Sequence, residues 1–186
     1  MPFDSRSTGS RERGGPTLTS YLTRDWFRFF LKHPNHPTLF GEIPAANDLE
    51  WDMPAIDSED IGLTEPESLD AIVEFLVSEG DRVPRETLNQ EWVEKGRELV
   101  EEEACSACHS LDGEEMDGPA LNGYGSRDWL KEVIRTPGKP HIFGERNTMP
   151  DHPDLSEREL EQLIDYLLNA PVRPLPEGER PHGDPT

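Results

Sequence analysis

Cys105-Ser106-Ala107-Cys108-His109 is the stretch that decides the fold of this 186-residue chain, and it holds the only two cysteines. The spacing C-x-x-C-H is the attachment pattern of c-type haem. Two thiols on one helical turn can reach the two vinyl groups of a porphyrin edge, and the adjacent imidazole then points at the iron. A porphyrin held by two thioethers cannot leave, so the motif predicts a permanent prosthetic group.

Other uses of a cysteine pair fit these residues less well. A structural zinc site usually has four nitrogen or sulfur ligands. His141 and His152 could join Cys105 and Cys108, but both lie in a Pro-rich stretch without paired ligand spacing. A thioredoxin-like dithiol is expected in a βαβ context, whereas the flanking segments read as helix and loop. A disulfide across two residues would leave His109 unexplained.

Composition limits both the core and the partners. Only 33% of the residues are hydrophobic, and the chain has 18 prolines and 15 glycines. So few apolar side chains make a small core for the chain to fold on, unless haem supplies additional apolar volume. With 18 Lys plus Arg against 39 Asp plus Glu, the formal net charge is −21, which disfavours binding to nucleic acid or an anionic membrane surface. The acidity suits a basic redox partner attracted at low salt, and general solubility or a salty habitat explains it equally well.

Neither a membrane span nor an export signal is recognisable. No stretch approaches the roughly 20 apolar residues of a membrane span, and residues 1–20 lack the apolar segment of a signal peptide. Because c-type haem is attached outside the cytoplasm in bacteria, we expect a periplasmic or otherwise extracytoplasmic location. We therefore expect that Met1 is not the start of the exported polypeptide.

The chain contains two copies of one sequence pattern. Residues 15–42 align with residues 118–145 at a constant offset of 103, with 12 identities in 28 positions. Further on, Met53-Pro54 corresponds to Met149-Pro150, and residues 69–76 correspond to residues 160–167. A period of this length is too long for a solenoid, so the sequence predicts two modules in tandem.

The repeat sets the expected domain boundaries. They are an incomplete or degenerate first module at 1–80, a linker at 81–88, a haem-binding module at 89–170 and a Pro-rich tail at 171–186. At the offset of 103, Cys105 corresponds to Pro2, so the first copy begins where its own motif would end. Either the first copy lost the motif or the sequence was cut just after it, and the survival of Met53-Pro54 favours the cut.

Hydrophobic periodicity predicts helices and no strands. In the second module we expect helices over 89–103, from Ser126 until Pro137 stops it, and from the capping box Ser156-x-x-Glu159 onward. The first module repeats the latter two helices at 24–32 and 67–78. The prediction is an all-α chain of two helical modules.

The order haem motif, Gly-Pro, helix, Met-Pro and terminal helix resembles a class I cytochrome c domain over residues 89–170. Residues 15–78 look like the rear two thirds of another, one that lacks its haem-attachment segment in this chain. The resemblance implies helices wrapped around haem, with the first and last helices of a module crossing. It also implies that a glycine on the first helix touches an aromatic residue on the last, and Gly96 and Tyr166 match those positions.

The resemblance further implies a set of haem-binding residues, namely Cys105, Cys108, His109, Pro119, Arg127 and Met149. His109 and Met149 would be the iron ligands. The carbonyl of Pro119 would orient the imidazole, and Arg127 would lie near the haem propionates. A thioether is a soft, neutral donor, so a His/Met pair raises the reduction potential.

Several of these roles have alternatives. Met116 is too close in sequence to the proximal histidine to reach over the ring easily. His141 or His152 could replace Met149 as the distal ligand, which would give a lower potential. Met149 could also be a loop residue with no metal role, and Arg127 could be a surface arginine at the start of a helix.

We expect a one-electron carrier rather than an enzyme, working in a respiratory chain. It would hold one covalent haem c, and a second if a C-x-x-C-H motif lies upstream of Met1. Its partners would be redox proteins, and the motif style also resembles domains attached to quinol–cytochrome c reductase complexes of the bc type. Two other functions stay open: a di-haem peroxidase-like enzyme, which needs an open iron site, and a first module acting as a haem-free docking domain.

Overall fold

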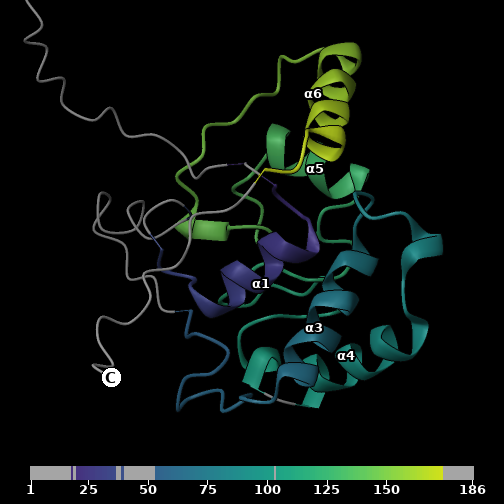
Figure 1. Cartoon of the computed structure of the whole chain (residues 1–186). Helices are drawn as coiled ribbons and strands as arrows, with labels where there is room; N and C mark the ends of the chain where they lie inside the picture. Colours follow the sequence, from purple (N-terminus) through teal and green to yellow (C-terminus); the bar gives the residue numbers. More distant parts are fainter. Residues whose placement is uncertain (1–17, 19, 37–38, 40–52, 103, 174–186) are drawn as a thin grey trace, which may run out of the picture.

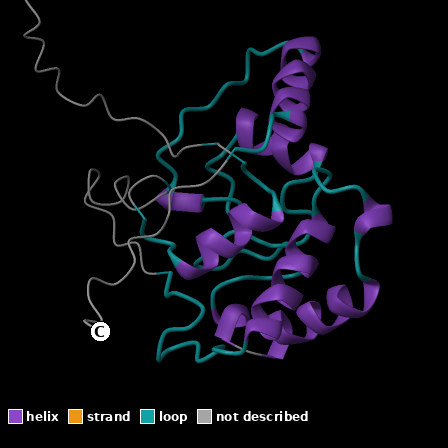
Figure 2. Ribbon diagram, viewed as in Figure 1, coloured by secondary structure: helices purple, strands orange, loops and turns teal. Residues whose placement is uncertain are grey.

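The computed structural model describes residues 18, 20–36, 39, 53–102 and 104–173, and within them it contains five α-helices and no strand (Figures 1 and 2). The α-helices are α1 (Arg24–Lys32), α3 (Pro66–Glu79), α4 (Gln90–Glu102), α5 (Arg127–Arg135) and α6 (Glu157–Asn169). Three short 3-10 helices accompany them, η1 (Arg85–Thr87), η2 (Ala104–Ala107) and η3 (Gly144–Arg146). The prediction of an all-α fold is confirmed.

Some sequence expectations fall outside the described residues. These are the Gly-Pro of the first copy at residues 15–16, its Phe-Gly-Glu at residues 40–42, and most of the expected tail, from residue 174 onward. None of the helices in the described ranges is long and apolar enough to cross a membrane.

Matching caps start the two helices that follow the repeated loop. The Thr23 hydroxyl accepts a hydrogen bond from the Trp26 N–H at 3.2 Å, and the Ser126 hydroxyl accepts one from the Trp129 N–H, also at 3.2 Å. A side-chain oxygen at this position satisfies one of the N–H groups that a helix start leaves unpaired. The two sequence copies therefore begin this helix in the same way.

Each copy packs its two helices together. α1 lies against α3, and α5 lies against α6 (Figure 1). The indoles at the starts of α1 and α5, Trp26 and Trp129, are 1% and 7% exposed. Burial of such large aromatic side chains dominates the energetics of small cores.

Equivalent residues of the two sequence copies touch each other. The hydroxyls of Tyr21 and Tyr124, which are 103 positions apart, lie 3.3 Å from each other. Leu22 fills the space that a side chain on Gly125, its equivalent, would occupy, since a Cβ there would lie 2.8 Å from the leucine Cδ2. The contact between the two copies is therefore made by the same loop in each.

The loops at this interface share a backbone path that glycine favours. Gly123 and Gly125 have φ of 66° and 80°, and their equivalents Ser20 and Leu22 have φ of 57° and 65°. Non-glycine residues seldom adopt positive φ. The first copy therefore keeps the loop conformation even where its own residues oppose it.

The expected contact between Gly96 and Tyr166 is wrong. α4 packs on α3 and not on α6: a Cβ on Gly96 would lie 2.0 Å from the Ala71 carbonyl oxygen and 2.8 Å from the Phe75 Cβ, while Tyr166 is 69% exposed. Figure 1 shows α3 and α4 side by side, with α6 apart from them beside α5.

The repeat explains this pairing. Phe75 is the equivalent of Tyr166, so α3 and α6 offer α4 similar faces. Ten residues join α3 to α4, whereas 54 separate α4 from α6. α3 is therefore the nearer of the two faces along the chain.

Candidate functional site

The two cysteines and the histidine of the motif share one tight turn directly after α4. The N–H groups of Cys108 and His109 both donate to the Cys105 carbonyl oxygen, at 3.1 and 2.9 Å. Cys105 is half-buried and Cys108 is exposed, and both are thiols rather than halves of a disulfide. The turn therefore presents two thiols and an imidazole together, as the spacing predicts.

His109 is held by the residue that the sequence pairs with it. Its Nδ1 lies 2.8 Å from the Pro119 carbonyl oxygen, so Nδ1 carries the proton and donates. Nε2 then keeps its lone pair for a metal, which is the arrangement that a second partner imposes on metal-binding imidazoles. Burial lowers the pKa of His109, and the hydrogen bond to Pro119 opposes that shift in part.

Gly118 is the surface on which the imidazole rests. A Cβ at Gly118 would lie 2.4 Å from the His109 Cε1 and 2.7 Å from its Nδ1, far closer than real contacts. The Gly118 N–H donates to the Cys108 carbonyl oxygen at 2.7 Å, and this hydrogen bond links the Gly118-Pro119 segment to the cysteine motif. Gly-Pro at 118–119 therefore both makes room for the ring and orients it.

Each copy buries an indole N–H that finds no hydrogen-bond acceptor among the described residues. These are the Nε1 atoms of Trp129 and of its equivalent Trp26. Leaving a buried donor unpaired costs about 1–3 kcal/mol, so such groups call for an explanation. A haem propionate is an acceptor of the right charge for the Trp129 donor, and the residues present therefore fit a haem. From the sequence, Trp129 could either line the haem or be a core aromatic residue, and its repetition as Trp26 does not separate the two.

Met149 is half-buried and packs against the core. The side chain of Asn147 makes two hydrogen bonds to the Met149 backbone. The Met149 N–H donates to the Asn147 Oδ1 at 3.0 Å, and the Asn147 Nδ2 donates to the Met149 carbonyl oxygen at 2.8 Å. These two bonds fix the backbone that carries the thioether. Sequence reasoning missed Asn147, because nothing in the N-x-M spacing marks it. Ligation by Met149 stays a prediction.

The competing ligands have other surroundings. The His141 Nε2 lies 3.0 Å from the Glu132 Oε2, while His152 and Met116 are exposed. No group of three or more His, Cys, Asp and Glu side chains in the described ranges is arranged to hold a metal ion. The four zinc ligands considered from the sequence are thus not assembled there.

Arg127 directs its guanidinium at α6. It pairs with Glu161 at 2.8 Å and with Asp165, and its backbone N–H donates to the Asp81 Oδ2 at 2.8 Å. These carboxylates raise the pKa of Arg127, the hydrogen bond to Asp165 contributing most. A propionate contact of Arg127 stays a prediction.

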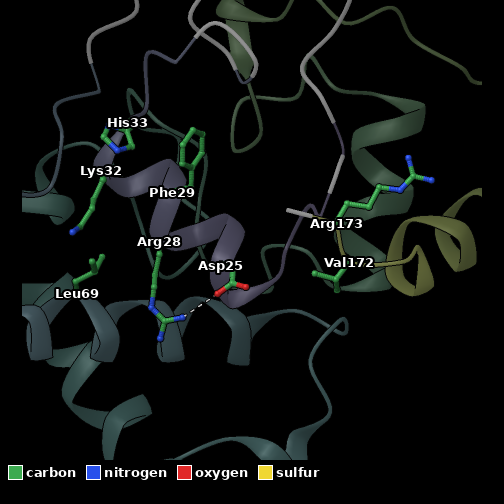
Figure 3. A pocket seen from close by; sticks show the side chains of 8 residues that line it. All are labelled: Asp25, Arg28, Phe29, Lys32, His33, Leu69, Val172 and Arg173. Atoms are coloured by element: carbon green, nitrogen blue, oxygen red, sulfur yellow. Dashed lines mark hydrogen bonds and ion pairs between the residues drawn. The ribbon is translucent and has the colours of Figure 1, made fainter. Parts of the chain in front are cut away.

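An open cavity of about 590 Å³ lies beside α1, and none of these site residues lines it (Figure 3). α1 supplies half of its lining residues, and His33, Leu69, Val172 and Arg173 supply the other half. One of its cations, Arg28, is already bonded to Asp70 at 2.7 Å and faces Asp25 at 3.5 Å. The histidine turn, not this cavity, carries the chemistry that the sequence predicts.

Comparison with known proteins finds similarity mainly to the second half of the chain. The cytochrome c family profile matches residues 93–171. Cytochrome c oxidase subunit 2 of Alkalihalophilus pseudofirmus is 32% identical over 117 residues, which cover 58% of this chain and 33% of that protein. A Cbb3-type cytochrome c oxidase subunit CcoP of Helicobacter pylori is 24% identical over 132 residues, 68% of this chain and 41% of that protein.

The matches cover only part of the length of each relative. The chain spans about a third to two fifths of the length of the curated proteins it matches. No solved structure matches it significantly.

Proposed function

We propose that the cytochrome c domain of residues 93–171 carries single electrons through a haem c bonded to Cys105 and Cys108. The observation that carries this proposal is the motif turn with its oriented imidazole, in which the 2.8 Å bond to Pro119 leaves the His109 Nε2 available. The cytochrome c family match over the same residues supports it. Bound haem would supply reversible one-electron exchange at its iron.

We propose that His109 and Met149 would hold the haem iron. The protein's part is to keep both groups in place: Pro119 and Gly118 restrain the imidazole, and Asn147 restrains the Met149 backbone. A neutral thioether together with an imidazole would favour the reduced metal and raise the reduction potential. The lowered pKa of His109 helps to keep the imidazole unprotonated and able to ligate.

The first copy would hold a second haem if a C-x-x-C-H motif precedes residue 1 in the natural polypeptide. Two described residues support this. Trp26 repeats the buried, unpartnered indole N–H of Trp129, and Met53 is half-buried against the core, as Met149 is. A copy that acts only as a haem-free docking domain would have no use for such a donor.

We place this electron transfer in a respiratory chain, in a periplasmic or otherwise extracytoplasmic location. The curated relatives are subunits of cytochrome c oxidases, so we favour an oxidase as the partner over the bc-type complex that the motif style suggests. The net charge of −21 suits a docking partner with a basic surface.

A redox titration of the exported protein combined with carbon monoxide tests this function. An electron carrier with both axial positions filled should titrate as a one-electron couple, and its reduced form should bind carbon monoxide only weakly at neutral pH. A peroxidase-like enzyme should instead bind carbon monoxide readily and consume peroxide at the same haem. Strong carbon monoxide binding would therefore refute the carrier assignment.

A further inference from the structure

One peptide group connects the imidazole of His109 to the loop that follows α5. The Pro119 carbonyl oxygen accepts the His109 Nδ1–H at 2.8 Å, and the N–H of the same peptide group, on Ala120, donates to the His141 carbonyl oxygen at 3.0 Å. A peptide group is planar and rigid. The position of the His141 carbonyl therefore sets the direction in which the Pro119 carbonyl points.

A carboxylate of α5 holds the turn that carries the His141 carbonyl. The Glu132 Oε2 lies 3.0 Å from the His141 Nε2, and the Glu132 Oε1 accepts from the Lys139 Nζ. These bonds lower the pKa of Glu132, the one from Lys139 contributing most, so the carboxylate is charged at neutral pH. The backbone of the turn is closed, because the Lys139 carbonyl oxygen accepts from the Ile142 N–H at 2.9 Å. Glu132 therefore binds two side chains of one closed turn.

The far end of the same loop has its own attachments. The Arg146 Nη1 donates to the Asp117 carbonyl oxygen at 2.9 Å, and Asn147 makes its two hydrogen bonds to the Met149 backbone. None of these bonds involves Glu132. Loss of Glu132 should thus loosen the His141 end of the loop more than the Met149 end.

The first copy makes the equivalent contact with different chemistry. Phe29 and His36 are the repeat equivalents of Glu132 and Lys139, and their rings lie edge to face with centroids 5.0 Å apart. Each copy therefore ties the residues that follow its helix back to the same helical position. In the second copy, which contains the Cys-x-x-Cys-His motif, a carboxylate takes this position and bonds His141 as well.

We propose that Glu132 is a positioning residue for the His109 imidazole, acting through the His141 carbonyl and the Pro119–Ala120 peptide group. Three hydrogen bonds in series carry its effect, and bonds in such a chain polarise one another. They keep the Pro119 carbonyl aimed at the His109 Nδ1, which keeps the imidazole a basic ligand. The inference rests on the proposed function in taking His109 as an iron ligand.

Glu132→Ala in the exported, haem-loaded chain tests this inference. Alanine removes both bonds of the carboxylate, and as the best helix former it should leave α5 intact. Proton NMR of the reduced protein should show the His109 Nδ1–H exchanging with solvent about tenfold faster, the factor expected for the loss of one hydrogen bond. The reduction potential should rise, because a weaker bond to Pro119 makes the imidazole a less basic ligand.

Glu132→Gln is the matched control, since it removes the same charge but keeps an oxygen that can accept from Lys139. It should speed the exchange and raise the potential less than Glu132→Ala does. Unchanged exchange in Glu132→Ala or a fall in its potential would overturn the inference. Equal effects of the two variants would also overturn it, because loss of the charge alone would then explain them. A wild-type chain without a one-electron haem couple would instead contradict the proposed function, so the two failures are distinguishable.

Discussion

The imidazole of His109 is confined on two sides by its neighbours. Pro119 accepts its Nδ1 proton at 2.8 Å, and Gly118 lies against its edge. Sequence reasoning reached His109 and Pro119 because the motif and the Gly-Pro pair are short and local. It did not reach Asn147 or the buried N–H of Trp129, because both depend on which groups the folded chain leaves unpartnered.

Gly118→Ala should disturb the imidazole directly. The new Cβ would lie 2.4 Å from the His109 Cε1, so the ring must move and its bond to Pro119 must lengthen. Overpacking of this kind costs about 1–3 kcal/mol of unfolding free energy. Denaturant unfolding and the reduction potential of the haem-loaded protein would both report the change.

Gly138→Ala is the control for that substitution, because its Cβ would meet nothing closer than 3.5 Å. It should leave both measurements nearly unchanged. Equal effects of the two substitutions would mean that the packing of Gly118 against His109 has no special role.

Met149→Ala tests the distal ligand. We expect haem to stay attached, because the thioethers do not depend on Met149. The reduction potential should fall by on the order of 0.1 V, within the span over which axial ligands tune haem, and the opened position should bind carbon monoxide. Met116→Ala, an exposed methionine, is the comparison and should change neither property. An unchanged potential in Met149→Ala would contradict the assignment.

Among the helices, α1 and α3 are joined by a nearly buried carboxylate. Glu74 is 6% exposed and accepts from the Arg24 Nε at 2.7 Å, the Arg24 Nη2 at 2.8 Å and the Asn89 N–H at 2.8 Å. The hydrogen bonds from Arg24 contribute most to lowering the pKa of Glu74 below its ordinary 4.5, and burial opposes them. The carboxylate therefore stabilises the fold in its charged form.

Glu74→Gln should lower the unfolding free energy by about 2 kcal/mol near neutral pH, as expected for hydrogen bonds to a charged group. Because the folded pKa is lowered, the stabilisation is present above pH 4.5 and is lost as the pH falls through the folded value. Denaturant unfolding at a series of pH values should show wild type and variant converging in acid.

Asp165→Asn changes the equivalent carboxylate on α6, which is 58% exposed and pairs with Arg127. Solvent screens such a pair, so its loss should matter much less. A parallel pH dependence of wild type and Glu74→Gln would show that Glu74 does not stabilise the fold as a carboxylate.

The helices themselves were predictable where local signals define them. The α5 start at Arg127 follows its Ser126 cap, and the α6 start at Glu157 follows its capping box. The partner of α4 was not predictable, because α3 and α6 carry equivalent residues of the repeat and the sequence of α4 does not distinguish between them. Gly96 was correctly singled out for a close crossing, but against the wrong helix.

At the scale of the whole molecule, the two copies of one sequence pattern meet at a contact between the equivalent residues Tyr21 and Tyr124. Burial raises the pKa of both phenols, so both stay protonated at neutral pH and able to share this contact. The sequence showed the repeat through its constant offset. It could not show that equivalent loops touch, because that contact depends on how the two sequence copies pack in the folded chain.

The central claim is that this chain carries haem by covalent bonds at Cys105 and Cys108. Intact mass of the exported, fully denatured protein tests it most directly, because only a covalent group survives denaturation. We predict that residues 1–186 retain the mass of one haem, and that Cys105→Ser/Cys108→Ser removes it. A wild-type chain that denatures to its bare polypeptide mass would contradict the account.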